Sequence, residues 1–141
     1  MLIHIRASLK LQVLKFKKIN CIKIKCGNMK TIKIDEVKVI ERSGGIFTGM
    51  VHIQSIVNET IESKDLNIAV VSFPAGVKNT FHTHNTDQLL WVLSGKGIVA
   101  TEHEEVIATP GMAFFIPTGE SHWHGATKDS PFSHISIRGQ G

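Results

Sequence analysis

The stretch GVKNTFHTHNTDQLLWVLSG, residues 76–95, contains the pattern on which the fold prediction depends. His82 and His84 stand two positions apart, and residues i and i+2 of an extended strand point to the same face, so both imidazoles can reach one point. Gln88 returns to that face if the strand continues. The apolar run after Gln88 ends at Gly95, a residue suited to a tight turn. The stretch therefore predicts a β-strand that begins with a group of converging polar side chains.

A second histidine cluster repeats this arrangement further along the chain, where His122 and His124 flank Trp123. A barrel that folds this cluster against the first one can assemble three or four side-chain ligands around one ion. Imidazole ligands without thiolates suit Mn, Fe, Co, Ni, Cu or Zn, and they disfavour Ca or Mg. The two clusters together predict a site for a divalent transition metal.

The remainder of the chain beyond residue 28 has the pattern of an all-β domain. Short runs rich in β-branched residues alternate with Gly, Pro and polar turn signals, and no segment has a capped helical stripe. Strands are expected over residues 31–40, 46–56, 66–73, 88–93, 98–102, 105–109, 113–116 and 132–137. Many short strands at this spacing indicate a sandwich or a barrel.

Positive charge and cysteine are concentrated at the beginning of the chain. Of its 141 residues, positions 1–28 hold seven cations, no acid and both cysteines, Cys21 and Cys26. Residues 29–141 carry nine cations against all twelve acids. This larger part is mildly acidic, which argues against nucleic acid as a partner, and it has neither a disulfide framework nor thiolate chemistry.

Residues 1–28 admit three interpretations: a basic presequence or membrane-surface arm, an additional pair of strands, or translated sequence upstream of a true start at Met29. We therefore divide the chain into a basic N-terminal extension, 1–28, and one domain, 29–141, which is long enough to bury a core. No stretch approaches the roughly 20 apolar residues that cross a bilayer, and no signal peptide is recognisable. We expect a cytoplasmic protein with no membrane partner.

Two longer motifs enclose the histidine clusters. The first is Gly76-x5-His82-x-His84-x3-Gln88-x6-Gly95, and the second is Gly111-x5-Pro117-x-Gly119-x2-His122, with 15 residues between them. Together they resemble the paired motifs of small cupins, with Gln88 where glutamate is usual. The resemblance implies a jelly-roll-like cupin β-barrel of two antiparallel sheets, with the metal in its mouth. It also implies a homodimer or a tetramer.

Within the cupins, the chain looks most like small manganese-dependent hydroxynitrile lyases and like the cupins associated with carboxymuconolactone decarboxylases. The features that carry this resemblance are Phe47-Thr48-Gly49, the His-x-His-x3-Gln pattern, the run from His122 to Ala126, and His134. The resemblance implies the metal ligands His82, His84, Gln88 and His122. It implies manganese as the most expected ion, with Fe, Ni, Zn, Co or Cu as alternatives. It also implies a pocket formed by His124, His134, Ala69 and Val71.

Arg138 departs from the lyase pattern, because those lyases carry a neutral amide at the corresponding position. This difference argues against a cyanohydrin as the physiological substrate. Arg138 shares strand parity with His134 and Ser136, and a guanidinium on that face can clamp a substrate carboxylate with two parallel hydrogen bonds. Gln88 differs from the usual glutamate in charge, so three imidazoles and an amide leave the ion at +2 and make it a stronger Lewis acid.

These features favour a lyase or isomerase that acts on a small oxygenated molecule by hydroxynitrile-lyase-like or retro-aldol chemistry. The ion would polarise a hydroxyl or carbonyl group, and His124 is placed to move the proton as a general base, with His134 as a second catalytic histidine. Two alternatives stay open because one barrel hosts many chemistries. They are a metal-dependent dioxygenase and a non-catalytic cupin that binds or senses a small ligand.

Overall fold

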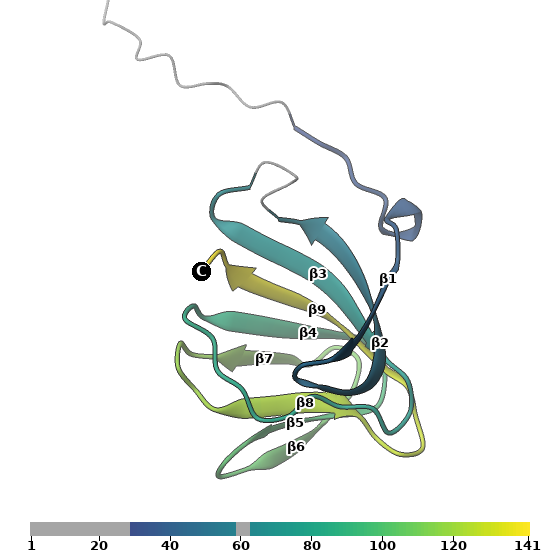
Figure 1. Ribbon diagram of the computed structural model, residues 1–141, viewed down its shortest axis with the longest axis vertical. Helices are drawn as coiled ribbons and strands as arrows, with labels where there is room; N and C mark the ends of the chain where they lie inside the picture. Colours follow the sequence, from purple (N-terminus) through teal and green to yellow (C-terminus); the bar gives the residue numbers. More distant parts are fainter. Residues whose placement is uncertain (1–28, 59–62) are drawn as a thin grey trace, which may run out of the picture. The chain divides into compact units, whose positions relative to one another are not determined.

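Nine β-strands and one short 3-10 helix form the part of the chain from Thr31 to Gly141, in a computed structural model that describes residues 29–58 and 63–141 (Figure 1). The predicted basic extension, 1–28, lies outside the described residues. In chain order the elements are η1 (Ile34–Glu36), β1 (Ile40–Gly44), β2 (Phe47–Val57), β3 (Leu66–Phe73), β4 (Gln88–Gly95), β5 (Gly97–Thr101), β6 (Glu105–Ala108), β7 (Ala113–Ile116), β8 (His122–Ala126) and β9 (Phe132–Gly139). Within these described ranges, no helix is long and apolar enough to cross a membrane.

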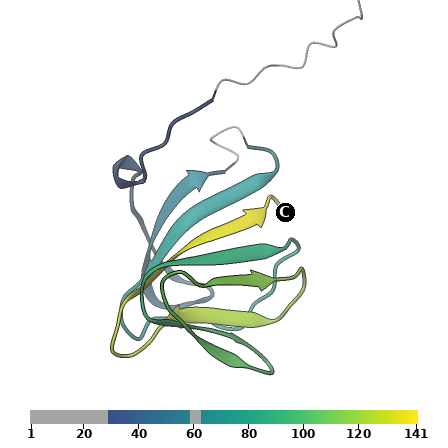
Figure 2. The same ribbon diagram turned by 180° about the vertical axis from the view of Figure 1, so that it is seen from behind.

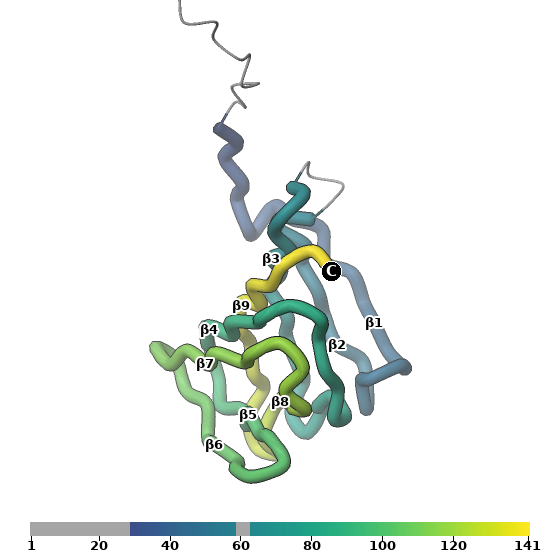
Figure 3. Tube along the Cα trace, turned by 90° about the vertical axis from the view of Figure 1, so that its left-hand side faces the viewer, coloured from purple at the N-terminus to yellow at the C-terminus, as the bar shows by residue number. Residues whose placement is uncertain are grey.

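The strands form two antiparallel sheets. The larger sheet has the order β1-β2-β3-β9-β4-β7, and the smaller one has the order β6-β5-β8. Figure 2 shows β9, β4 and β7 following one another across the larger sheet, and Figure 3 shows the edge strands β1 and β6 at opposite margins of the domain. This arrangement confirms the predicted all-β, jelly-roll-like barrel of two antiparallel sheets.

One apolar core joins the two sheets, because strand alternation directs every second side chain inward. In β4, for example, Leu90 and Val92 are buried, whereas Trp91 between them is exposed. The buried apolar cluster takes members from both sheets: Val51, Phe73, Leu90, Val92, Val99, Ala108, Ile116, Ala126 and Phe132. The core therefore fills one end of the barrel and leaves the polar inward positions of β3, β4 and β9 to form a site.

Gly95 makes the turn from β4 to β5, as the sequence predicted. Its φ angle of 75° lies in the left-handed region, and a Cβ at this position would collide with the carbonyl oxygen of Pro131. Only glycine therefore satisfies both the backbone angle and the close approach of the loop before β9.

The strand predicted over residues 31–40 is wrong. The segment contains the 3-10 turn η1, and β1 begins only at Ile40. The side-chain amide of Gln54 donates to the backbone carbonyls of Ile34 (2.8 Å) and Val37 (3.0 Å), which a strand would have offered to a neighbouring strand. Gln54 lies 20 positions from Ile34 in the sequence. The sequence of residues 31–40 therefore contains no local signal that distinguishes this segment from a strand.

Candidate metal centre and cavity

Backbone pairing brings the two histidine clusters together. His82 and His122 form an isolated antiparallel bridge, in which the N–H of His82 donates to the carbonyl of His122 (2.9 Å) and the reverse bond measures 3.0 Å. The centroids of their imidazole rings lie 4.3 Å apart. The bridge therefore holds the first residue of each cluster side by side at the open end of the barrel.

The third histidine completes a compact group. The ring centroid of His84 lies 4.9 Å from that of His82 and 5.4 Å from that of His122. Each of the three histidines offers one nitrogen such that these three atoms lie within 4.8 Å of one another. Two nitrogens that bind one ion at about 2.0–2.1 Å are at most about 4.2 Å apart, so closure of the rings by less than about 1 Å would let all three histidines bind one ion.

The ring orientation of two of these histidines is set by backbone carbonyls. Nδ1 of His82 donates to the carbonyl of Thr80 (2.8 Å), and Nδ1 of His122 donates to the carbonyl of Glu120 (2.8 Å). A carbonyl oxygen only accepts, so the ring proton of the neutral imidazole sits on Nδ1 and the lone pair on Nε2. Both histidines thus present a free electron pair to the group, which is the arrangement found in metal-ligating histidines.

Gln88 directs its amide oxygen at the same point. Its buried side chain donates from Nε2 to the hydroxyl of Ser136 (2.8 Å), while Oε1 lies 3.1 Å from Nε2 of His122. When the His122 ring carries a single proton, the Glu120 carbonyl holds that proton on Nδ1, so both facing atoms are acceptors and a cation between them would satisfy both. Nε2 of His84 is also buried with no hydrogen bond to any described residue. These atoms fit a divalent transition metal.

The turn that the sequence predicted before His122 is fastened to the first motif. The Asp87 carboxylate accepts hydrogen bonds from the backbone N–H and the hydroxyl of Thr118, both at 2.8 Å, and these bonds lower the pKa of Asp87. The N–H of Gly119 donates to the carbonyl of His84 (2.9 Å). The loop after His84 and the turn before His122 therefore position each other.

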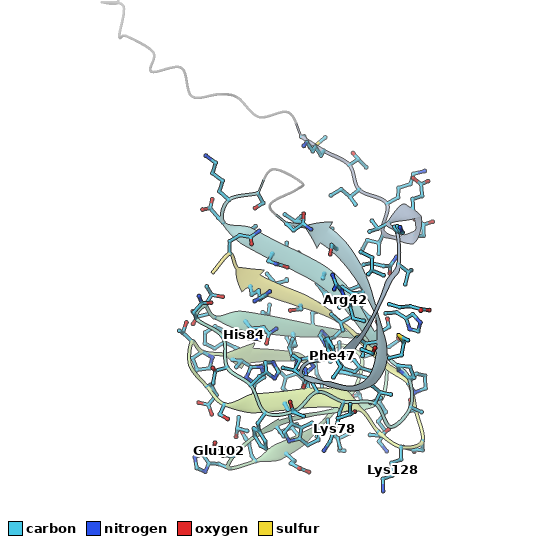
Figure 4. The ribbon with its side chains drawn as sticks, in the orientation of Figure 1. Arg42, Phe47, Lys78, His84, Glu102 and Lys128 are labelled. Carbon is cyan, nitrogen blue, oxygen red and sulfur yellow. The ribbon has the colours of Figure 1, made fainter. Side chains whose placement is uncertain are left out.

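A cavity of about 280 Å³ opens beside this group. Its lining includes all five predicted pocket residues, Ala69, Val71, His124, His134 and Arg138, together with the ligand candidates His82, His84 and Gln88. Two further lining residues, Arg42 and Asn79, are not predicted from the sequence. Figure 4 shows Arg42 on β1 and His84 on the loop before β4, both lying over the larger sheet.

Asn79 determines which nitrogen of His124 carries the proton. The Asn79 side chain is buried, and its Oδ1 accepts the backbone N–H of His124 (2.7 Å). This bond orients the amide so that Nδ2 donates to Nε2 of His124 (3.2 Å). The proton of the neutral ring is therefore on Nδ1, which is buried without a hydrogen bond to a described residue. His124 thus offers the cavity a donor, and its lone pair is already occupied.

His134 differs from His124 in the hydrogen bonding of its ring nitrogens. It is fully buried between Phe73, Phe132 and His124, with ring centroids 5.9, 5.4 and 4.8 Å away. Neither ring nitrogen has a well-formed hydrogen bond to a described residue. Its lone pair is therefore free.

Burial keeps these cavity histidines neutral. It lowers the pKa of His134 to about 4, although the nearby Ile135 backbone opposes the shift. Burial, followed by the charges of the other histidines, holds the pKa of His124 well below its usual value. The pKa of His84 is lowered to about 4, first by burial and then by the charges of His82 and Arg138. Uncharged imidazoles at neutral pH are the form that binds a cation.

His134→Phe is expected to stabilise the metal-free protein and to weaken its acid sensitivity. Because the folded pKa of His134 is below the unfolded value, the unfolded state binds more protons, and stability falls as the pH drops from 6.5 to about 4. That loss amounts to about 3 kcal/mol for His134. Removing two buried nitrogens that lack well-formed hydrogen bonds to the described residues should add about 1 kcal/mol at neutral pH. Urea unfolding at several pH values checks this, with the exposed His103→Phe as a control that should leave the pH profile unchanged.

The antiparallel double-sheet barrel and its cluster of histidines in the barrel mouth define the class of protein. The family model for the cupin domain matches residues 69–138, which include every ligand candidate. The chain also matches the cupin-like protein of Thermotoga maritima at 31% identity, with a TM-score of 0.65, over 69% of this chain and 74% of that one. The chain therefore belongs to the cupin family.

Two further similarities are informative to different degrees. An (R)-mandelonitrile lyase from Granulicella tundricola is 35% identical over 71 residues, which are 50% of this chain. The match spans only 54% of the length of that lyase. The polyketide cyclase RemF from Streptomyces resistomycificus has a TM-score of 0.72 at 16% identity, covering 79% of this chain and 80% of that one. At so low an identity, this second similarity concerns the fold alone.

Proposed function

We propose that this cupin is a metal-dependent lyase or isomerase that acts on a small oxygenated substrate by hydroxynitrile-lyase-like or retro-aldol chemistry. The observation that carries the proposal is the pair of neutral, buried histidines, His124 and His134, that line one cavity with the candidate ligands. A cavity that only binds a ligand has no need of two adjacent imidazoles, one with a free proton and the other with a free lone pair. The similarity to a mandelonitrile lyase supports the same conclusion.

The ion would be held by His82, His84, His122 and Gln88. When bound, a divalent ion would act as a Lewis acid toward a hydroxyl or carbonyl oxygen of the substrate. Manganese is our first expectation, because the resemblance to manganese-dependent lyases implies it. An imidazole and oxygen ligand set without thiolates also suits Fe, Ni, Zn, Co and Cu. Ser136 holds the Gln88 amide through a hydrogen bond of 2.8 Å and so keeps Oε1 directed at the ligand group.

The two cavity histidines have different roles in the proposed reaction. The sequence suggested His124 as the general base, but Asn79 occupies the lone pair of its Nε2 and leaves its Nδ1–H as a donor. We therefore assign to His134 the removal of the proton from the substrate hydroxyl, because the described residues leave its lone pair free. As the C–C bond breaks, the hydroxyl oxygen becomes the carbonyl oxygen, and the leaving cyanide or carbanion takes up the same proton from His134. His124 donates a hydrogen bond from Nδ1 to the substrate, and burial keeps both rings neutral until the proton moves.

Elemental analysis and an activity assay together test the proposal. Purified protein loaded with manganese should release benzaldehyde from mandelonitrile, and His134→Ala should lose most of that activity while retaining the metal. Substrate-dependent consumption of oxygen would instead favour the dioxygenase alternative. Tight binding of a small ligand without turnover would favour a non-catalytic cupin. Absence of bound metal after loading would contradict the proposal.

We expect a homodimer or a tetramer, as the resemblance predicts. The outer face of the larger sheet exposes Trp91 (51%), Leu93 (41%) and Phe115 (66%) on the neighbouring strands β4 and β7. Exposed apolar side chains that adjoin one another are typical of contact surfaces. The double variant Trp91→Glu and Phe115→Glu should reduce the molar mass measured by light scattering to that of a monomer. An unchanged mass would place the contact elsewhere.

A cytoplasmic location stays a prediction from the sequence.

A further inference from the structure

The arginines of the domain are distributed in an unusual way. Residues 29–141 contain two arginines, Arg42 and Arg138, and both line the cavity. The other seven cations of this part are lysines, and no lysine or carboxylate of the described ranges 29–58 and 63–141 lines it. The cavity thus takes every guanidinium of the domain and none of the described negative charges.

Arg138 lies next to the ligand group. On β9 it pairs in register with Gln88 on β4 and with Asn67 on β3, and all three line the cavity. It follows His134 and Ser136 along the same inward face of the strand. Its charge acts on the nearest histidines, since it contributes to lowering the pKa of both His82 and His84. An anion that Arg138 binds would therefore sit directly beside the candidate metal ligands.

Arg42 reaches the same cavity from another direction. It belongs to the edge strand β1, which β2 and β3 separate from β9 in the sheet. Its side chain is exposed at the cavity mouth and lies over the larger sheet in Figure 4. In the described part of the chain, neither Arg42 nor Arg138 forms an ion pair with a carboxylate. Two guanidinium groups that pair with no described carboxylate therefore face one small space.

The electrostatic consequence is an excess of positive charge. The candidate ligands, three imidazoles and one amide, are neutral, so they compensate none of the charge of a bound ion. A low-dielectric concavity that carries charge of one sign raises the local concentration of ligands of the opposite sign. The planar fork of arginine matches a carboxylate in a bidentate manner, whereas a neutral nitrile or hydroxyl gains little from it.

We infer that the cavity takes a small 2-hydroxy- or 2-oxocarboxylate, whose carboxylate is bound by Arg138 with Arg42 as a second cation at the mouth. The oxygen function on the carbon beside the carboxylate then faces His82, His84 and Gln88, because Arg138 adjoins them. The carbon skeleton lies toward the small apolar residues Ala69 and Val71. This inference names the substrate class for the proposed function, but its binding step does not require that any reaction follows.

The test measures binding by isothermal titration calorimetry, with mandelate as the probe and mandelamide as its neutral counterpart, on the full chain at low salt. In both metal-free and manganese-loaded protein, mandelate should bind about 10-fold or more tightly than mandelamide, as expected for charge-assisted hydrogen bonds. Arg138→Gln should remove most of this preference, and Arg42→Gln should reduce it by a smaller factor. Lys128→Gln changes the net charge equally at an exposed position outside the cavity and should leave the preference intact.

Two results would overturn the inference. The first is equal affinity for mandelate and mandelamide, and the second is an unchanged preference in Arg138→Gln, which would assign the carboxylate to a group other than Arg138. Thermal unfolding of each variant distinguishes a lost guanidinium from a lost fold, and Arg138→Lys should restore part of the preference. Failure of the proposed function has a different signature, because a protein without lyase activity that still prefers mandelate keeps this inference intact.

Discussion

His122→Ala is expected to lower the affinity for divalent manganese by on the order of 100-fold or more, and with it all metal-dependent activity. Even residues that only orient metal ligands are worth about 10- to 100-fold in affinity, so loss of a ligand should cost at least as much. His122 is fully buried, hydrogen-bonded to the Glu120 carbonyl, and 3.1 Å from the Gln88 amide oxygen. Truncation of His122 therefore removes one metal ligand and leaves the Gln88 amide oxygen without its neighbouring ligand.

Metal titration followed by elemental analysis measures this effect. His103→Ala is the matched control, because His103 is exposed and lies outside the cavity lining. Circular dichroism establishes that the variant is folded, which matters because His122 also bridges to His82 through the backbone. The backbone bridge does not depend on the side chain, so the fold should persist. Metal binding at wild-type affinity in folded His122→Ala would exclude this group of histidines as the metal site.

The ligand candidates could be predicted from the sequence because their geometry is local. The i, i+2 spacing of His82 and His84 places both on one face, and the turn at Gly119 directs the chain into β8. The prediction that the two clusters meet in space depended on the paired motif, because the spacing within one cluster gives no information about where the other cluster lies. The observed bridge between His82 and His122 is a contact across 40 positions of the chain.

Two candidate functional residues, Asn79 and Arg42, could not be predicted from the sequence. Asn79 acts on His124 from a paired backbone segment 45 positions away in the sequence, and only the structure reveals that both ends of its amide are used. Arg42 stands on an edge strand beside acidic and polar neighbours, where a surface role is the ordinary expectation. One signal was present in the sequence: Arg42 and Arg138 are the only arginines beyond residue 28. The wrong strand over 31–40 has a similar cause, because Gln54, far along the chain, decides that segment.

The cavity trades stability for reactivity. His134 is fully buried, and neither of its nitrogens has a well-formed hydrogen bond to a described residue; the inward positions that surround it would support a more stable core if they were apolar. Two guanidinium groups that form no ion pair with a described residue add repulsion toward any cation in the same space. Such costs are expected where a site is built to receive a charged ligand, and they disappear when the ligand binds.

Gln88→Glu is expected to strengthen metal binding while it weakens carboxylate binding and activity. A carboxylate ligand adds a full negative charge beside the ion, which should raise the affinity for manganese by about 10-fold or more. The same charge lies in register with Arg138 on the neighbouring strand, so the two side chains should form an ion pair. Arg138 would then be less available to the substrate, and the ion would be a weaker Lewis acid.

This variant is diagnostic because metal affinity is expected to rise while carboxylate affinity and activity are expected to fall. We expect the affinity for mandelate to fall by about 10-fold, as for the loss of a charge-assisted hydrogen bond, and turnover to fall further. Lys128→Gln changes the net charge of the protein by the same amount outside the cavity, and it should alter neither quantity. If Gln88→Glu strengthened metal binding and left turnover and mandelate affinity unchanged, the neutral amide would serve only to hold the metal. A fall in both at undiminished metal occupancy would instead mean that the charge of the ligand shell selects the substrate, which is the property that separates Gln88 from the usual glutamate.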